Sequence, residues 1–266
     1  MIRAEAITSV RNPVLRDVRR AVQRGALTPG GLCVAATFHL LEEALASGCA
    51  VPVVLAGRSV APMVEKHVRG LQRTRLLVLE DALLTELSGT ESPQGVVALV
   101  QPPTWTLDHL FRGRSLLLIL DGIQDPGNAG SLLRAAEAFG ATGALFVKGT
   151  ANPYHPKTVR ASAGSLFRLP CLAGLDADMA RAACAQRRVE IYAAGPRDGL
   201  LLDEADLTRP CAIVIGSEGR GVGAEFGRAA RSLTIPTTGV ESLNAAAAAA
   251  IILYEAARQR RLQALL

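Results

Sequence analysis

The amino-acid sequence predicts an α/β protein, and its second half is expected to form a parallel sheet with helices on both faces. Three observations support this prediction. Short apolar runs alternate with helical stretches along most of the 266 residues, 49% of the residues are apolar, and the strongest runs contain no regular polar alternation. A parallel strand that is buried on both faces has this continuous apolar pattern, whereas a half-exposed strand alternates.

The first hundred residues have the pattern of a smaller α/β domain. Candidate strands and helices alternate in the order Leu32–Ala35, Phe38–Ala46, Val51–Ala56, Met63–Leu71, Leu76–Leu79, Ala82–Leu87 and Val96–Val100. Two consecutive prolines, Pro102 and Pro103, then interrupt the pattern, because proline lacks the backbone N–H that helices and sheets use. We therefore expect an N-terminal domain over residues 1–100, a linker over 101–113 and a second domain over 114–266.

The second domain begins with a predicted strand at Ser115–Leu120 and a helix at Ala129–Phe139 that ends at Gly140. Later strands are expected at Ala144–Val147, Val189–Ala193, Ala212–Ile215 and Leu233–Ile235. Later helices are expected at Met179–Gln186, Ala224–Arg231 and Leu243–Leu262. Alternation of this kind indicates a parallel sheet, and such sheets bind ligands beyond the carboxyl ends of their strands.

Composition argues against several classes of protein. The longest apolar run, Ala245–Tyr254, ends after ten residues at Glu255, and charged residues interrupt the N-terminus, so we expect no membrane span, no secretion signal and a cytoplasmic location. The five cysteines are scattered without a CxxC spacing, which argues against a disulfide framework and against a thiolate metal site. Reduced core thiols and no bound metal are expected.

Positive charge is concentrated near the N-terminus. The net charge is +5, and the first 25 residues hold six arginines against Glu5 and Asp17. Such a stripe suits a polyanion. The candidates for contacts with RNA phosphates are Arg16, Arg19, Arg20 and Arg24. An ordinary solvated helix face has the same composition, so this feature alone leaves both interpretations open.

The first of three polar clusters follows the strand at 115–120. Asn128 is the expected N-cap of the next helix. Arg134 lies about 200° around that helix from the buried Leu132, and its side chain leans back over the turn. The alternative interpretation is a capping Asn128 with a surface ion pair between Arg134 and Glu137.

The second cluster follows the strand at 212–215. Gly216, Glu218 and Gly221 lie in a stretch with four glycines in eight residues, which allows the backbone to approach a ligand closely. The stretch is not a phosphate-binding Walker A loop, because the GK[ST] ending is missing. Taken alone, any glycine-rich turn after a strand has this appearance.

The third cluster extends from Ile235 to Asn244 and opens the alanine-rich final helix. Ser242 is the expected N-cap of that helix, which leaves Asn244 without a capping role. The alternative is a capped helix with no further function. All three clusters are expected at the carboxyl ends of strands, and this joint placement is what points to a single site.

In order and spacing, the clusters resemble the three motifs of the SpoU/TrmH branch of the SPOUT RNA methyltransferases. The resemblance covers residues 115–262 closely and residues 1–100 more loosely, as an RNA-binding domain. It implies a homodimer with a C-terminal trefoil knot, which is an exception to the rule that chains do not thread loops. It further implies that S-adenosylmethionine binds in the knot and that the enzyme methylates a ribose 2′-hydroxyl.

The same resemblance implies roles for individual residues. The residues expected around the reacting ribose are Asn128, Arg134, Glu218, Ser242 and Asn244. Those expected to line the cofactor pocket are Gly216, Gly221, Ile235 and Leu243. Because a guanidinium is always protonated, we expect Arg134 to anchor a substrate phosphate and to stabilise the developing oxyanion rather than to act as a base. Glu218 is expected to orient Arg134 or the ribose.

By analogy with the family, a chain with two domains and a basic N-terminus is expected to act on 23S ribosomal RNA rather than on tRNA. Methylation of a tRNA ribose is the first alternative. A nucleotide-dependent metabolic enzyme on the same sheet and a non-catalytic RNA-binding protein are further alternatives, because a fold alone does not determine function.

Overall fold

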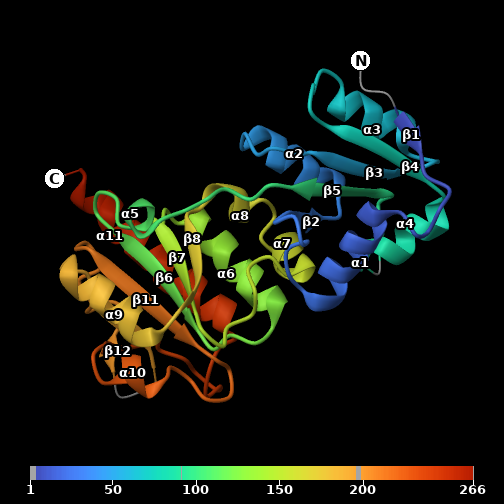
Figure 1. Ribbon diagram of the computed structural model, residues 1–266. Coiled ribbons are helices and arrows are strands. Elements are labelled where there is room, and N and C mark those ends of the chain that lie inside the picture. Colours follow the sequence, from blue (N-terminus) through green and yellow to red (C-terminus); the bar gives the residue numbers. More distant parts are fainter. Residues whose placement is uncertain (1–3, 91, 196–198, 266) are drawn as a thin grey trace. The chain divides into compact units, whose positions relative to one another are not determined.

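The computed structural model describes residues 4–90, 92–195 and 199–265. The chain divides into two compact units (Figure 1). The first unit contains the residues up to 104 together with 154–168, and the second unit contains residues 105–153 and 169–266. Among the described residues, no helix combines the length and the apolar character that a membrane span requires.

The first unit is built on a mixed five-stranded sheet in the order β1-β4-β3-β5-β2. Its strands are β1 (Ala4–Ala6), β2 (Cys33–Ala35), β3 (Val53–Gly57), β4 (Arg75–Leu79) and β5 (Val96–Val100), and its first four helices are α1 (Pro13–Arg24), α2 (Phe38–Ala46), α3 (Ala61–Val68) and α4 (Asp81–Ser88). The β1, β4 and β3 strands are parallel, and β5 runs antiparallel to β3 and β2. Strand β1 was not predicted, because its three residues are all exposed.

A segment distant in sequence completes the first unit. Residues 154–168 form α7 (Pro156–Ala161) and α8 (Ser165–Arg168). Helix α7 packs near β2, and Arg168 forms an ion pair with Glu43 of α2. The predicted second domain over 114–266 included this segment, and the structure instead groups it with the first unit. Local sequence patterns cannot reveal such a long-range assignment.

The second unit is a seven-stranded parallel sheet in the order β10-β12-β9-β11-β6-β7-β8. Its strands are β6 (Leu116–Asp121), β7 (Gly143–Val147), β8 (Cys171–Leu175), β9 (Glu190–Ala194), β10 (Leu200–Leu201), β11 (Cys211–Gly216) and β12 (Arg231–Thr234). The central strands β6 and β11 are buried over almost their whole lengths. The prediction of a parallel sheet is confirmed, and β8 and β10 are additions to it.

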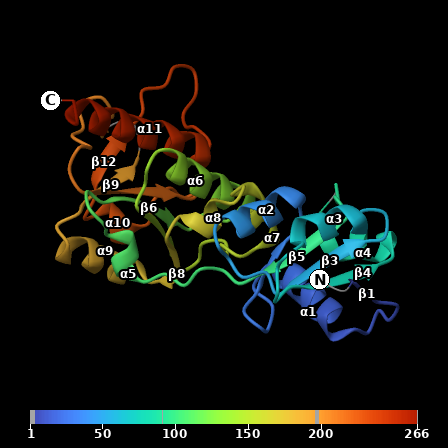
Figure 2. The same ribbon diagram turned by 90° about the horizontal axis from the view of Figure 1, so that it is seen from above.

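Helices cover both faces of this sheet, as predicted (Figure 2). They are α5 (Leu107–Leu110), α6 (Pro126–Ala138), α9 (Ala177–Gln186), α10 (Ala224–Gly227) and α11 (Ala245–Gln263). Alternate strand residues such as Leu117 and Val214 pack with Leu110 of α5, Ala180 of α9 and Phe226 of α10. Helices α6 and α11 lie side by side on the other face. This arrangement brings the start of α6 near the start of α11.

The five cysteines are free thiols, and all except Cys49 are buried. Burial raises the pKa of the Cys33, Cys171 and Cys184 thiols to about 12 and that of Cys211 to about 11, because thiolates are poorly solvated in the core. These cysteines therefore pack as small apolar side chains.

The protonated thiols make stability sensitive to alkaline pH. In the unfolded chain they ionise near pH 9.0, so above that value the unfolded state binds fewer protons than the folded state. The stability contribution is complete below pH 9 and is lost as pH rises, by about 1.4 kcal/mol per buried cysteine per pH unit. Urea unfolding at pH 8 and pH 10 measures this loss of unfolding free energy. In Cys171→Ala the loss should be smaller by the contribution of one cysteine. Equal free energies of unfolding at both pH values would contradict this prediction.

Candidate active site

The three polar clusters lie at one edge of the second-unit sheet. Strand β6 ends at Asp121, β11 ends at Gly216 and β12 ends at Thr234, and all of these strands are parallel. Their carboxyl ends therefore face the same edge, which is where α/β sheets bind ligands. The first cluster leads into α6, the second forms a glycine-rich turn, and the third leads into α11.

Helix α6 begins earlier than predicted. Its N-cap is Asp125, whose Oδ2 accepts a hydrogen bond of 2.9 Å from the backbone N–H of Asn128, and Pro126 occupies the first helical position. The prediction that Asn128 is the N-cap was therefore wrong. Proline is favoured at the first helical position because the backbone N–H that it lacks would have no partner within the helix there. The consequence is that the amide side chain of Asn128 is available for other contacts.

Three side chains from the three clusters form one hydrogen-bonded chain. The Nδ2 of Asn244 donates to Oδ1 of Asn128 at 3.4 Å, and the Nδ2 of Asn128 donates to a carboxylate oxygen of Glu218. We call these three residues the Asn-Asn-Glu chain. They are separated by up to 116 positions in sequence, so their convergence is a property of the fold.

Asn244 also has the capping role that was predicted for Ser242. Its Oδ1 accepts hydrogen bonds from the backbone N–H groups of Ala246 at 2.9 Å and Ala247 at 3.4 Å, which begins α11 at Ala245. The prediction that Ser242 caps the helix was therefore wrong. Because the Oδ1 of Asn244 is held by the helix, only its Nδ2 is directed at Asn128. Ser242 is exposed and makes no side-chain hydrogen bond within the described part of the chain.

Arg134 lies in the third turn of α6, about 9 Å along the helix axis from Asn128. It is exposed, and it makes no side-chain hydrogen bond or ion pair with any residue that the structure describes. The surface pair with Glu137 is therefore not observed. Since helical side chains lean toward the N-terminus, this long guanidinium can reach back toward the Asn-Asn-Glu chain.

A tight turn follows β11. The backbones of Ser217 and Gly221 exchange two hydrogen bonds, of 3.1 and 2.8 Å, and Gly221 has a left-handed φ of +67° that favours glycine. A Cβ on Gly216 would lie 2.1 Å from the carbonyl carbon of Gly221. The turn is tied to β6, since the N–H of Gly223 donates to Oδ2 of Asp121 at 2.7 Å. Glycine is therefore required at positions 216 and 221.

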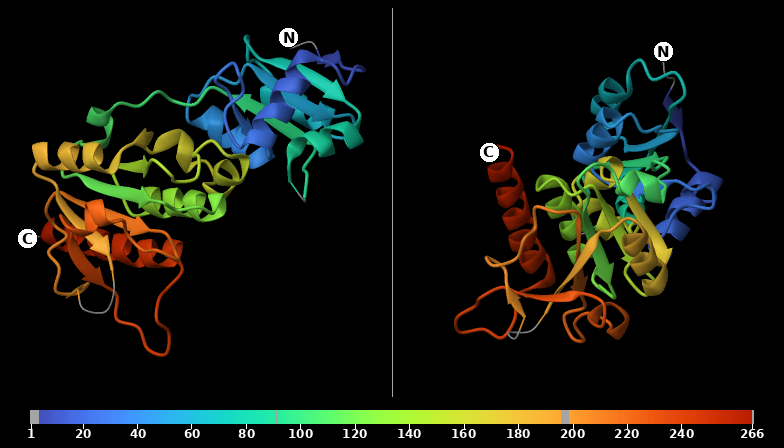
Figure 3. Two further views of the ribbon diagram at one scale, coloured as in Figure 1. Left: turned by 60° about the horizontal axis from the view of Figure 1, so that its bottom comes forward. Right: turned by 90° about the vertical axis from the view of Figure 1, so that its left-hand side faces the viewer.

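The third segment, residues 235–244, forms an extended loop between β12 and α11 (Figure 3). Ile235 and Leu243 at its two ends are half-buried. Within the described residues, Ile235 and residues 241–243 make no backbone–backbone hydrogen bonds. Apolar side chains beside available backbone N–H and C=O groups suit a flat heterocycle with a few polar atoms, such as adenine. The loop therefore leaves backbone hydrogen-bonding groups and two half-buried apolar side chains at the carboxyl edge of the sheet.

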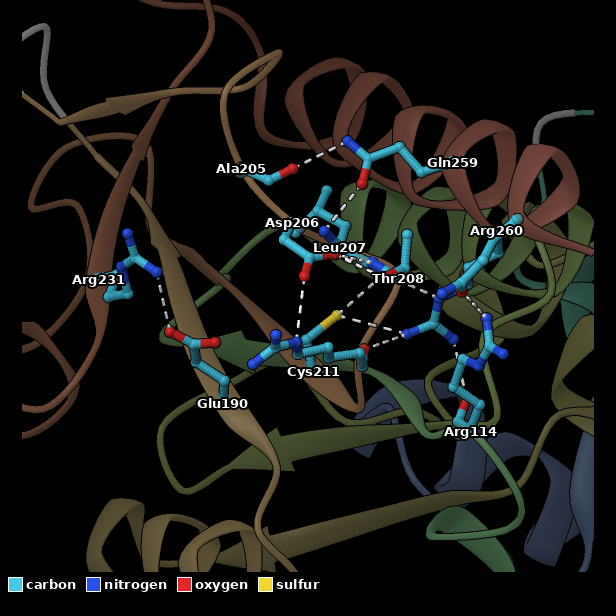
Figure 4. A network of polar contacts seen from close by, with 12 residues as sticks. Arg114, Glu190, Ala205, Asp206, Leu207, Thr208, Cys211, Arg231, Gln259 and Arg260 are labelled. Carbon is cyan, nitrogen blue, oxygen red and sulfur yellow. Dashed lines mark hydrogen bonds and ion pairs between the residues drawn. The ribbon is translucent and has the colours of Figure 1, made fainter. Parts of the chain in front are cut away.

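A network of polar contacts holds the other half of α11 in place (Figure 4). The Arg260 guanidinium donates to four backbone carbonyl oxygens, those of Arg114, Ser115, Leu207 and Arg209, at 2.8 to 3.0 Å. Gln259 adds bonds to Ala205 and Leu207. Burial lowers the pKa of Arg260. This anchor was not predicted from the sequence, and it holds the helix that begins at Ala245.

The predicted RNA-binding arginines lie on α1. Asn12 caps this helix, and its buried stripe is Leu15, Val18 and Ala21. The arginines occupy the remaining surface, and Arg16, Arg20 and Arg24 are spaced by four residues and so share one face. Arg19 forms an ion pair of 3.1 Å with Glu86, which offsets its charge. Arg3, another arginine of the basic N-terminus, lies outside the described residues.

A parallel sheet with a glycine-rich turn and a polar cluster at its carboxyl edge is the arrangement in which α/β proteins bind ligands. The sequence pattern of the SpoU rRNA Methylase family matches residues 115–254. The chain belongs to this family, and it is an enzyme of the RNA methyltransferase class.

Two characterised relatives and one solved structure illustrate the similarity. The chain is 30% identical to the 23S rRNA (guanosine(2553)-2′-O)-methyltransferase RlmP of Bacillus subtilis, over 93% of this chain and 97% of that protein. It is 37% identical to the 23S rRNA (uridine(2479)-2′-O)-methyltransferase of Streptomyces viridochromogenes, over 71% of this chain and 69% of that protein. The crystal structure of the SpoU methyltransferase AviRb from Streptomyces viridochromogenes with AdoMet has a TM-score of 0.82 and 28% identity, and the match covers 94% of this chain and 100% of that one.

Proposed function

We propose that this protein transfers a methyl group from S-adenosylmethionine to a ribose 2′-hydroxyl of 23S ribosomal RNA. The observation that carries the proposal is the Asn-Asn-Glu chain, which unites all three sequence clusters at the ligand-binding edge of the sheet. The relatives support the reaction, because their names specify 2′-O-methylation of 23S rRNA. A ribosomal RNA substrate also implies that the protein acts in the cytoplasm.

The cofactor is held by the two segments that fit a nucleoside. The backbone of the turn from Gly216 to Gly221, together with Ile235 and Leu243, forms the pocket for its adenosine part. When bound, S-adenosylmethionine supplies an electrophilic methyl group on a sulfonium. Support comes from the AdoMet complex of the AviRb relative, whose fold matches along nearly the whole chain.

The substrate is positioned by the polar side chains. Arg134 anchors a phosphate beside the target nucleotide through its planar fork and stabilises the oxyanion that develops on the 2′-oxygen. Asn128, Asn244 and Ser242 bind the ribose through hydrogen bonds. Positioning supplies much of the acceleration, because it converts a bimolecular reaction into a reaction within one complex.

A transfer assay tests this function. The protein is incubated with S-adenosylmethionine that carries a tritiated methyl group and with RNA fractionated into 23S rRNA, 16S rRNA and tRNA from cells that lack it. We expect label in 23S rRNA alone. Label in tRNA would support the tRNA alternative. Binding of RNA without any transfer would support a non-catalytic protein, and calorimetric binding of NAD in place of S-adenosylmethionine would support a metabolic enzyme.

The first unit selects the RNA. Its proposed RNA-binding part is residues 1–100, followed by a linker over 101–113, and the proposed methyltransferase domain over 114–266 excludes the segment 154–168 that is grouped with the first unit. The support is the exposed line of Arg16, Arg20 and Arg24 on α1. Arg19 contributes less, because Glu86 already offsets its charge.

Replacing Arg16, Arg20 and Arg24 together by Gln should weaken RNA binding and reduce its salt dependence. Each lost phosphate contact lowers the slope of log K against log salt by about 0.7 to 0.9, so the triple variant should lose about 2 to 3 units of slope. Fluorescence anisotropy at several salt concentrations measures this slope. The matched control replaces Lys66, Arg69 and Arg73, which are exposed elsewhere in the first unit. The same loss in both variants would contradict a specific role for α1.

The second unit forms a homodimer and contains a C-terminal trefoil knot. The knot is supported by the chain path, since the chain leaves β12, returns past β9 and β11, and packs α11 against α6. The dimer is supported by the exposed apolar side chains of α11, Ile251 at 40% exposure and Tyr254 at 49%. Exposed apolar side chains on one helix are typical of an association surface.

Replacing Ile251 and Tyr254 together by Asp should convert the dimer into a monomer, because two charges would have to be buried in the interface. Light scattering coupled to size exclusion gives the mass directly. Met179 on α9, at 59% exposure and on the opposite face of the sheet, is the control. If Met179→Asp dissociates the dimer and the α11 variant does not, the dimer forms through the α9 face of the sheet and the proposed α11 interface is wrong.

A further inference from the structure

Methylation of a hydroxyl releases one proton, and the site must contain a group that takes it. Arg134 cannot do so, because a guanidinium is already protonated. The four histidines are His39, His67, His109 and His155, and none lies in the three clusters. The side-chain amides of Asn128 and Asn244 are neither acids nor bases at neutral pH. Among the side chains of the three clusters, the carboxylates are therefore the groups that can accept a proton at neutral pH.

Two carboxylates near the site, those of Asp121 and Asp125, already accept hydrogen bonds from backbone N–H groups. Oδ2 of Asp121 accepts the N–H of Gly223 at 2.7 Å, and Oδ2 of Asp125 accepts the N–H of Asn128 at 2.9 Å. Protonating either would weaken a bond that shapes the site. Glu218 differs, because the hydrogen bond that the structure gives its carboxylate comes from the side chain of Asn128. Glu218 is also exposed at the ligand-binding edge, so its second oxygen can meet a substrate.

The Asn-Asn-Glu chain determines how this carboxylate is held. The Oδ1 of Asn244 is fixed by the N-terminus of α11, so its Nδ2 donates to Oδ1 of Asn128. The Oδ1 of Asn128 is then occupied, and its Nδ2 must donate toward Glu218. Flipping either amide would place donor against donor. The hydrogen-bonded chain therefore ends at the Glu218 carboxylate. One of its oxygens accepts from Asn128, and the other is available to a substrate.

We propose that Glu218 is the general base of the reaction, a role that rests on the proposed function. The 2′-oxygen attacks the methyl carbon, an O–C bond forms, and the S–C bond breaks with its electron pair remaining on sulfur. The 2′-O–H bond breaks and its proton moves to Glu218, which later releases it to water. Arg134 stabilises the oxygen while charge develops, and Asn128 and Asn244 hold the base in place.

The isosteric variant Glu218→Gln tests this assignment, because its amide oxygen can still accept from Asn128 but cannot take the proton. Single-turnover rates with saturating S-adenosylmethionine and 23S rRNA should fall by about 10² to 10⁴, the usual contribution of a general base. The dissociation constants for cofactor and RNA should change less than threefold. The control is Glu204→Gln, an exposed carboxylate of the second unit outside the three clusters, which should react at a near-normal rate.

Chemical rescue distinguishes a base from a merely structural residue. Glu218→Ala should regain activity in proportion to added formate, whereas Arg134→Ala should not. Near-normal transfer by Glu218→Gln, or no response of Glu218→Ala to formate, would overturn the proposal and leave Glu218 as an orienting residue. If the unaltered protein itself methylates no RNA, the proposed function fails instead, so the two failures are distinguishable.

Discussion

Replacing Arg134 by Ala should reduce methyl transfer by at least 10³-fold while leaving S-adenosylmethionine affinity nearly unchanged. Loss of a single group that stabilises an oxyanion costs about 10² to 10³ in rate, and here the phosphate anchor is lost as well. The side chain is exposed and makes no ion pair with the residues described, so its removal should not destabilise α6. Single-turnover rates with saturating cofactor, together with calorimetry for cofactor binding, measure both effects.

Arg134→Lys is the sharper form of the same experiment. Lysine keeps the positive charge but loses the planar fork that holds a phosphate at two points, so it should recover little of the activity. Strong recovery by lysine would favour simple charge over bidentate anchoring. Near-normal transfer by Arg134→Ala would instead make this residue an ordinary surface arginine.

Replacing Gly216 by Ala should reduce S-adenosylmethionine affinity more than tenfold. The new Cβ would lie 2.1 Å from a backbone carbon of Gly221, so the turn that forms one wall of the proposed cofactor pocket would have to move. Overpacking of this kind also destabilises a protein by about 1 to 3 kcal/mol. Calorimetry gives the affinity, and urea unfolding confirms that the variant is folded at the temperature used.

Gly219→Ala is the matched control for this variant. Gly219 lies in the same turn, but a Cβ there would meet no atom within 4 Å, and its φ is not left-handed. It should therefore bind the cofactor almost normally. If both glycine variants bind normally, the cofactor pocket lies elsewhere on the sheet edge.

The sheet of the second unit could be predicted from sequence because its central strands are continuous apolar runs. Strand β8 was missed because its five residues include Ala173 and Gly174, which have low strand propensity. The grouping of residues 154–168 with the first unit depends on contacts with α2 and β2, which no local pattern encodes. Patterns of burial within an element are therefore predictable, whereas assignment to a unit is not.

The site shows the same division. The position of all three clusters at the carboxyl edge could be predicted from the order of the strands, whereas the N-cap residues of α6 and α11 could not. The pair Asp125-Pro126 is a signal for a helix start that should have displaced Asn128 as the cap. Asn244 replaced Ser242 as the cap because the loop continues two residues further. Both errors concealed the hydrogen bonds that connect Asn128, Asn244 and Glu218, since these depend on the crossing of distant segments.

A map of 2′-O-methyl groups in ribosomal RNA from cells with and without this protein tests the proposed ribose 2′-O-methylation of 23S rRNA. A 2′-O-methyl group blocks alkaline cleavage of the adjoining phosphodiester, so each modified nucleotide appears as a gap in the cleavage ladder. We expect one gap in 23S rRNA that disappears without the protein and returns with the unaltered chain but not with Arg134→Ala. Identical ladders in both strains, or a methyl group found on a base, would contradict the account.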